Sequence, residues 1–377
     1  MKIILKIMTV VAIIGCLFTS CKKEYTITVK SNNEAWGRVT GSGTYAKGKI
    51  ITIRALAKPN YTFLSWQDGS TENPRYIIVR SDARYVAKFV RMGNGGGSGE
   101  EPINMGIFSV SATQKVNFSP GNLQWSATNG GNTATTHTVA GNGTEAGTWR
   151  FAPNQWDMVG TDNSNVSSTY TGWIDLFGWA TSGYNNKYPY MTSTVTTDYG
   201  NTANNITGTN YDWGVYNAIY NPQTKKTDAP GTWRTLTKEE SEYLMNVRST
   251  SSSIRYAKAT VHGVAGLIIV PDDYSNTYYT LTNVNTEGAA YASNIIDATT
   301  WTKMETIGCI FLPAAGSRDG NSVHDVATCG NYWSITVCGT QGANYLYFNA
   351  SNVYPMGFWY TANRIYGHSV RLVKDVK

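Results

Sequence analysis

Apolar and polar residues alternate with a period of two in several short segments between residues 24 and 91. The alternation runs through Tyr25, Ile27 and Val29, and again through residues 51–53, 76–78 and 85–89. Such alternation of β-branched and aromatic residues predicts β-strands. Glycines at 37, 41, 43, 48 and 69 predict the turns between them. We therefore expect residues 24–91 to form a small all-β module, with Phe63 and Trp66 anchoring its core.

A change in composition follows this module. Residues 92–103 contain the run GNGGGSGEEP, and chains rich in glycine and serine behave as flexible coil. This segment is therefore predicted to be a linker and a domain boundary. No second linker of this kind occurs, so residues 104–377 are predicted to form one large domain.

The large domain shows mostly strand patterns and only two helical ones. Apolar alternation begins at residues 107–118, and polar loops rich in Gly, Asn and Thr span residues 126–148 and 185–210. The sequence Thr237-Lys238-Glu239-Glu240 is a capping box followed by an apolar helical face, which predicts a helix start at Thr237. A second short helix is expected at residues 300–305. Many short strands with few helices predict an α+β fold.

Composition narrows the class of protein. Charged residues make up 15% of the chain, below the roughly 25% of an average soluble domain. The formal charge is +6, and it falls to about +4 without residues 1–20, which hold Lys2 and Lys6 and no acid. This charge is too small and too scattered to indicate a nucleic-acid partner. Uncharged polar loops and many aromatics favour an extracellular module.

The N-terminus has the pattern of a targeting segment. Lys2 and Lys6 precede a short apolar run at residues 7–18, too short to span a bilayer. Residues 1–20 are thus predicted to be a signal peptide. The sequence FTSCKKE resembles a bacterial lipoprotein signal, which implies acylation of Cys21 and anchoring in the outer membrane. Cys16 is a rival acylation site, and an ordinary secretory signal is the alternative. The charged residues after Cys21 resemble the leader of surface-exported Bacteroidetes lipoproteins and imply exposure on the cell surface.

Three cysteines remain, without the spacing of a zinc site. Cys309 lies in an apolar strand pattern and is expected to be buried. Cys329 and Cys338 bracket the segment GNYWSITV. They are candidates for a disulfide that closes a short loop, or else two free thiols.

Residues 24–91 also carry a family resemblance. The patterns G-x-V-x-G-S-G-x-Y, G-x-x-I-T-I-x-A, Y-x-F-x-x-W-x-D-G and Y-x-A-x-F resemble the divergent internalin-B-type repeat. The resemblance implies a spacer or accessory module of a bacterial surface protein. The segment GTYAKGK is close to a phosphate-binding loop, but Ile50 stands where the Mg²⁺-binding hydroxyl is needed.

The large domain resembles a widespread group of Bacteroidetes surface lipoproteins. The resemblance rests on FSPGNLQW, WRFAPNQWD, DLFGWATSGY, YDWGVYNAI, WRTLTKEESEYL, GLIIVPDDY, FLPAAGSRDG, YWSIT and GHSVRLVK, in this order. That group is similar to the C-type-lectin-like fold of formylglycine-generating enzymes and the Fibrobacter major paralogous domain. The resemblance implies an α+β domain whose first and last strands pair and whose loops present ligand contacts.

Aromatic and amide side chains cluster near the C-terminus, which is typical of adaptable recognition surfaces. The candidate ligand-binding residues are Trp333, Tyr345, Tyr347, Asn349, Asn352, Trp359, Tyr360, Asn363 and Arg364. The alternative for strand aromatics such as Trp333 is a place in the core. Tyr345 and Tyr347 share a strand face, so both are expected to be inside or both outside.

These observations lead to one functional expectation and two alternatives. We expect a surface lipoprotein that binds an extracellular glycan or protein and is not an enzyme. No cofactor or metal is expected, since the segment DGNSVHD at 319–325 lacks the Gly at the sixth position and the Glu at the twelfth position of a calcium loop. The alternatives are an assembly component of a surface appendage and a formylglycine-generating-enzyme-like oxidase that uses Cys329 and Cys338.

Overall fold

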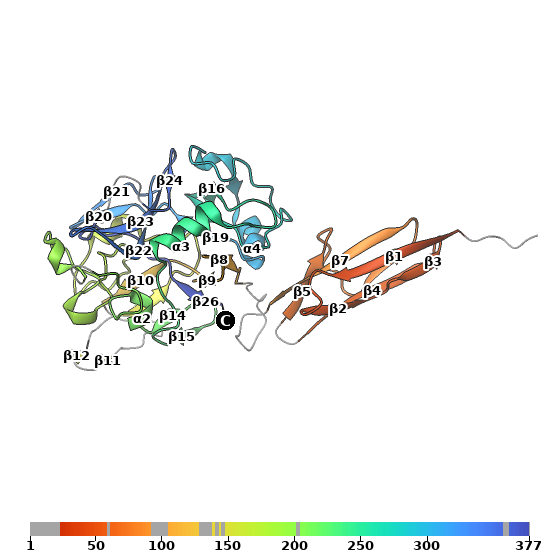
Figure 1. Ribbon diagram of the computed structural model, residues 1–377, viewed down its shortest axis with the longest axis horizontal. Coiled ribbons are helices and arrows are strands. Elements are labelled where there is room, and N and C mark those ends of the chain that lie inside the picture. The colour runs from red at the N-terminus through yellow and green to blue at the C-terminus, as the bar shows by residue number, and fades with distance from the viewer. Residues whose placement is uncertain are drawn as a thin grey trace, which may run out of the picture. The chain divides into compact units, whose positions relative to one another are not determined.

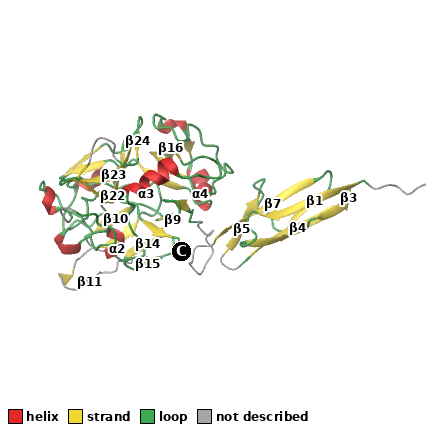
Figure 2. Ribbon diagram, in the orientation of Figure 1, coloured by secondary structure: helices red, strands yellow, loops and turns green. Residues whose placement is uncertain are grey.

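The computed structural model describes residues 23–58, 61–91, 105–127, 138–139, 143–144, 148–200, 204–356 and 362–376. The predicted signal peptide and linker lie outside these ranges. Contacts within the chain define two compact units, Met1–Asn94 and Gly95–Lys377, called here the N-terminal and C-terminal units. The fold is strand-rich, with 37% strand and 12% helix. Figure 2 colours the strands yellow and the helices red.

Two sheets form the N-terminal unit. Its strands are β1 (Glu24–Ser31), β2 (Gly37–Thr40), β3 (Gly43–Ala46), β4 (Ile50–Ala57), β5 (Tyr61–Trp66), β6 (Arg75–Ile78) and β7 (Ala83–Arg91). One sheet has the order β3-β1-β7-β5 and the other β2-β4-β6. Their inner faces share one apolar core. Trp66 is fully buried in it, as predicted, and the half-buried Phe63 packs beside it.

The residues of β6 that face the core are not the ones that the sequence pattern predicted. That pattern selected Tyr76 and Ile78 as its alternating residues, but both are exposed, at 68% and 50%. Ile77 and Val79 face the core instead. Residues 76–79, YIIV, are a continuous apolar run, so an alternation of period two fits either phase, and a shift of one residue exchanges the two faces.

The C-terminal unit has short helices and many short strands (Figure 1). The helices are η2 (Gly160–Ser164), η3 (Tyr184–Asn186), η4 (Thr196–Asp198), α2 (Trp213–Tyr216), α3 (Lys238–Glu242), the π-helical turn η5 (Tyr243–Val247), η6 (Tyr291–Ser293) and α4 (Ala298–Thr306). The strands are β8 (Phe108–Ser109), β9 (Lys115–Phe118), β10 (Leu123–Ser126), β11 (Thr138–Val139), β12 (Gly143–Thr144), β13 (Thr148–Phe151), β14 (Ile219–Asn221), β15 (Lys226–Asp228), β16 (Tyr256–Val261), β17 (Val264–Ile269), β18 (Ile295–Ile296), β19 (Ile310–Pro313), β20 (Ser317–Asp319), β21 (Ser322–His324), β22 (Gly330–Cys338), β23 (Gly342–Phe348), β24 (Val353–Tyr354), β25 (Ala362–Asn363) and β26 (Val373–Asp375).

These strands form several small sheets. Four-stranded sheets have the orders β10-β13-β14-β15 and β18-β16-β17-β19, and β22-β23-β24 carries β25 on β23. The remaining sheets are β26-β9-β8, β20-β21 and β11-β12. The last strand, β26, pairs antiparallel with β9, and the first strand, β8, lies on the other edge of β9. The two ends of the unit therefore meet in one sheet, with the last strand beside the second strand instead of the first.

Both predicted helices are present. Thr237 Oγ1 accepts a hydrogen bond from Glu240 N, and the Glu240 carboxylate accepts one from Thr237 N, which completes the capping box at α3. Helix α4 covers the segment expected at residues 300–305 and is capped by Asp297, whose side chain accepts from Thr300 N. The local polar pattern was sufficient to predict the start of a helix, because a cap acts within one helical turn.

The hairpin of β22 and β23 lies deep in the C-terminal unit. Seven of the nine residues of β22 and six of the seven residues of β23 are buried. Residues of the two strands belong to two different core clusters, so both faces of this hairpin are covered. This placement decides how the predicted site residues lie.

Candidate functional site

Trp333 and Tyr345 are cross-strand neighbours on β22 and β23, and both belong to the core. Their exposed fractions are 3% and 8%. Trp333 Nε1 donates to the Phe177 carbonyl at 2.7 Å, and its ring stacks on His368 with 4.2 Å between the centroids. In this structure these two side chains are structural core residues with little surface for a ligand. Their predicted contact with a ligand remains a prediction.

Tyr347 lies at the outer end of the same face, where the core gives way to solvent. The Tyr345 and Tyr347 rings are 6.3 Å apart, but Tyr347 is half-buried. Both side chains therefore face the same core cluster, as expected, but Tyr347 is buried less completely than Tyr345. A single strand face can pass from core to surface along its length.

The structure brings two further predicted residues, Asn349 and Asn352, together with Tyr347. Asn349 Nδ2 donates to Tyr347 Oη at 2.7 Å, and Asn349 Oδ1 accepts from the backbone N–H groups of Ser351 and Asn352 at 2.8 Å. Tyr354 Oη donates to Asn352 Oδ1 at 2.8 Å. The rings of Tyr347 and Tyr354 stack with 6.1 Å between their centroids. We call Tyr347, Asn349, Asn352 and Tyr354 the Tyr347 patch.

The turn between β23 and β24 builds this patch. Tyr347 pairs with Tyr354 and Phe348 with Val353, so the two strands hold both tyrosines side by side. The Asn349 side chain closes the intervening turn, which is the usual role of an asparagine in a loop. All four side chains are half-buried and mutually bonded. The patch thus has a preorganised shape with aromatic and amide groups at the surface.

Residues distant in sequence complete the surroundings of the patch. Cys329 Sγ lies 3.7 Å from Tyr347 Oη, and Tyr291 Oη donates to the Thr328 carbonyl at 2.9 Å. Burial raises the pKa of Tyr291 and of Tyr347, so both phenols stay protonated. Sequence reasoning missed Tyr291 because it precedes Tyr347 by more than fifty residues and no local pattern connects the two.

Two further predicted residues, Asn363 and Arg364, have contacts away from the patch. Asn363 lies on β25 and accepts from Ile365 N at 3.3 Å. Arg364 is buried, with its guanidinium 4.8 Å from the Trp179 ring centroid and its Nε donating to the Gly342 carbonyl. Trp359, Tyr360 and the predicted lipidation site Cys21 lie outside the described residues.

Of the two alternatives for Cys329 and Cys338, a disulfide and two free thiols, the structure shows the second. Both residues are free thiols, and they stand at opposite ends of β22, which begins at Gly330. At about 3.3 Å per residue the strand holds their Cα atoms roughly 30 Å apart, whereas a disulfide needs less than about 7 Å. The segment GNYWSITV is a strand and not a closed loop. Cys309 is a free, buried thiol as expected, and burial raises its pKa.

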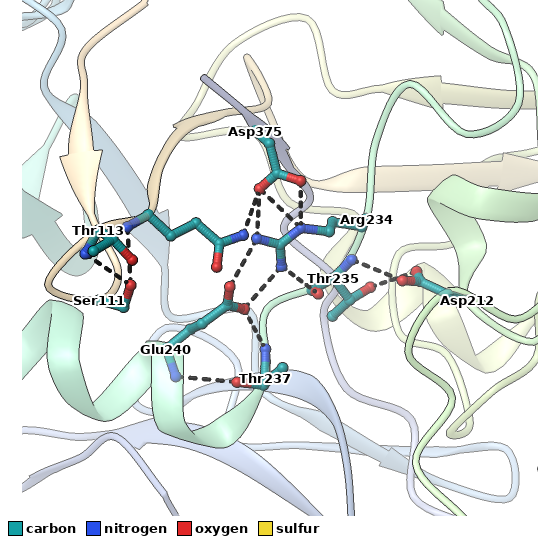
Figure 3. Close-up of polar contacts among 9 residues, drawn as sticks. Ser111, Thr113, Asp212, Arg234, Thr235, Thr237, Glu240 and Asp375 are labelled. Carbon is teal, nitrogen blue, oxygen red and sulfur yellow. Dashed lines mark hydrogen bonds and ion pairs between the residues drawn. The ribbon is translucent and has the colours of Figure 1, made fainter. Parts of the chain in front are cut away.

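A second polar cluster has a structural role. Arg234 donates to Glu240 of α3 and to Asp375 of β26, at 2.7 Å in each case (Figure 3). Burial opposes the charge of Arg234, but the bonds to these two carboxylates outweigh it and raise the pKa of the guanidinium. The neighbouring Thr235 donates from N and Oγ1 to Asp212, a buried carboxyl whose pKa is raised to about 6 by burial. We call Arg234, Glu240 and Asp375 the Arg234 cluster; it fastens β26 to α3.

Within the ranges the structure describes, no three His, Cys, Asp or Glu residues converge as metal ligands. Residues 319–324 belong to the tight hairpin of β20 and β21, in which Asp319 pairs with Ser322. Among the described helices, none has the length and apolarity needed to cross a bilayer.

Comparison with known proteins identifies one part of the chain. Residues 27–93 match the model of the divergent InlB B-repeat domain, which confirms the predicted resemblance of the N-terminal unit. The curated proteins and the solved structures contain no match to this chain.

Proposed function

We propose that this protein is a surface-anchored binding protein whose C-terminal unit recognises an extracellular glycan or protein through the Tyr347 patch. The observation that carries the proposal is the bonded set of Tyr347, Asn349, Asn352 and Tyr354 at the surface end of a buried hairpin. Their amide and phenol groups supply donors and acceptors, and the two stacked rings supply flat apolar area. Tyr and Asn combine rigid contact area with adaptable hydrogen bonding.

The architecture is consistent with the proposed C-type-lectin-like fold. In the C-terminal unit the last strand, β26, pairs with β9 near the beginning of the unit. Such closure fixes the ends of the domain in one sheet and leaves the long intervening segments free to present contacts. The buried hairpin of β22 and β23 gives the patch a rigid base. Binding sites are often loops held by such scaffolds.

The proposed location rests on the N-terminus and on the repeat. Acylation of Cys21 would anchor the protein in the outer membrane, and export would expose it on the cell surface. The matched InlB B-repeat is consistent with a protein that displays a second domain. Acylation is tested by metabolic labelling with a fatty acid, which Cys21→Ala abolishes and Cys16→Ala leaves intact.

The binding site is tested by screening residues 22–377 on glycan arrays and on arrays of extracellular proteins. A ligand found in this way is then titrated against Asn352→Ala plus Tyr354→Ala. We expect at least about a tenfold loss of affinity, because a central aromatic and its hydrogen-bonded partner are removed.

The chain offers a matched control for this double variant. Tyr188 Oη donates to Asn186 Oδ1 at 2.9 Å, so Asn186→Ala plus Tyr188→Ala removes the same chemical pair elsewhere on the C-terminal unit. Loss of binding in the control with full binding in the patch variant would place the site elsewhere. Capture of sibling surface proteins alone would favour the assembly alternative.

The oxidase alternative requires Cys329 and Cys338 to act as a pair. Cys329 and Cys338 stand at opposite ends of β22, so they cannot bind one copper ion together.

A further inference from the structure

Charge is divided unequally between the two units. Residues 23–91 contain twelve Lys and Arg against five Asp and Glu, a net charge of +7, whereas residues 92–377 contain sixteen against twenty, a net charge of −4. The modest charge of the whole chain conceals this separation. A strongly basic module joined to an acidic one indicates that the module has an anionic partner of its own.

One face of the basic module also exposes large apolar side chains. On the β2-β4-β6 sheet, the register places Ile50 opposite Ile78 and Thr52 opposite Tyr76. The exposed fractions of Ile50, Ile78 and Tyr76 are 64%, 50% and 68%, and Leu56 on the same strand face is 41% exposed. Inward-facing neighbours on these strands are buried, so the apolar residues lie on the side away from the core.

Arginines accompany these apolar residues. Arg38 lies opposite Leu56, and Arg54 lies opposite Thr40, so both arginines are on the outer side of the same sheet. Strands β2, β4 and β6 contain no acidic residue. We call this surface, formed by Arg38, Ile50, Arg54, Leu56, Tyr76 and Ile78, the Ile50 face.

The other sheet of the module presents a different outer surface. There Thr28 lies opposite Arg84, and Lys30 follows on the same side of β1. Both cations are exposed, but among the residues whose burial is described, none of the large exposed hydrophobic residues of the N-terminal unit lies on this sheet. The two outer surfaces therefore have cations in common and differ in apolar content.

We propose that the Ile50 face docks on an anionic lipid surface. Arginine binds the anionic headgroups, while Ile50, Leu56, Tyr76 and Ile78 enter the apolar boundary beneath them, as in interfacial amphipathic helices. An acidic polysaccharide would pair with the arginines but would leave the aliphatic side chains in water. Strand β1 begins three residues after Cys21, so an acylated Cys21 would hold the module within about 10 Å of the bilayer.

The test uses residues 22–377, which lack Cys21, so a failure of the proposed anchor does not affect its result. Flotation is measured with vesicles of phosphatidylcholine alone and of phosphatidylcholine mixed with phosphatidylglycerol. We expect binding to the anionic vesicles only, weakening as salt increases. Ile50→Ser plus Ile78→Ser should reduce the partition coefficient about tenfold because two exposed apolar side chains are lost.

Matched variants separate the Ile50 face from general charge and general hydrophobicity. Arg38→Gln plus Arg54→Gln should reduce binding at least about tenfold, since each cation near an anionic surface contributes about a fivefold factor. Lys30→Gln plus Arg84→Gln makes the same charge change on the opposite face and should reduce binding less. Val247→Ser plus Ile295→Ser removes two exposed apolar residues of the C-terminal unit and should leave binding unchanged.

Several results would overturn the proposal. Equal losses in the two charge variants would show that no particular face docks. Binding to dextran sulfate but not to vesicles would identify a polysaccharide partner. Concentration-dependent dimerisation that Ile50→Ser plus Ile78→Ser abolishes, without vesicle binding, would assign the face to a second copy of the chain.

Discussion

His368 lies inside the C-terminal unit between aromatic rings, with its centroid 4.2 Å from that of Trp333 and 4.9 Å from that of Tyr345. Its Nδ1 has no hydrogen-bond partner among the described residues. Burial disfavours the charged imidazolium and lowers the pKa from 6.5 to about 3. Acid therefore protonates this histidine in the unfolded chain before it does so in the folded protein.

This difference predicts a loss of stability in acid. The contribution is fully present above pH 6.5 and decreases as the pH falls toward 3, because only the unfolded state takes up the proton. Between pH 7 and pH 4.5 the free energy of unfolding should fall by ~3 kcal/mol more in the wild type than in His368→Gln. Urea unfolding at the two pH values measures this difference. His262 is exposed and serves as the control, so His262→Gln should show the same fall in the free energy of unfolding as the wild type. An equal fall in His368→Gln would contradict the assignment of this pH dependence to His368.

The predicted ligand residues show what sequence reasoning can resolve at the scale of single residues. Tyr347, Asn349 and Asn352 come together as one surface group, because a short turn places neighbours in sequence near one another in space. Trp333 and Tyr345 are buried because the hairpin is covered on both faces. Arg364 is buried against the Trp179 ring and the Gly342 carbonyl. Aromatic content is similar in a core and in a binding surface, so the distinction requires the tertiary fold.

Helix α3 joins local and distant interactions. The Glu240 carboxylate accepts a hydrogen bond from Thr237 N within the capping box and another from the Arg234 guanidinium. Arg234 also donates to Asp375 of the last strand. The cap was predictable from the sequence because its partners lie within one turn. The Arg234 cluster was not, because Asp375 follows Arg234 by more than a hundred residues and is recruited by the pairing of β26.

This double role predicts unequal effects for two adjacent acids. Glu240→Gln should lower the free energy of unfolding by ~2 kcal/mol, because it removes the charge that Arg234 pairs with in a half-buried position. Glu239→Gln makes the same charge change in the same helical turn, but Glu239 is exposed, and its effect should stay within about 0.5 kcal/mol. Denaturant unfolding monitored by tryptophan fluorescence provides the comparison. Equal effects would mean that the cluster contributes nothing beyond helix charge.

At the scale of the whole molecule, each unit has a core of its own. The apolar cluster of the N-terminal unit contains only residues of that unit, and three further clusters lie in the C-terminal unit. Composition predicted this organisation, since an apolar-poor segment separates two patterned regions. The pairing of short strands into sheets was not predictable, because strands of two to four residues carry too little pattern to specify their partners.

Separate cores predict separate unfolding. Ile53 is fully buried in the N-terminal unit, and Ile53→Ala should destabilise that unit by about 2–5 kcal/mol through lost burial and a cavity. Leu267 is equally buried in the C-terminal unit, and Leu267→Ala should cost a similar amount there. Calorimetry should then show two unfolding transitions, and each variant should lower the midpoint temperature of only one of them. A single transition that both variants lower together would show that the two units unfold cooperatively, and stability measured for one unit would then report on both.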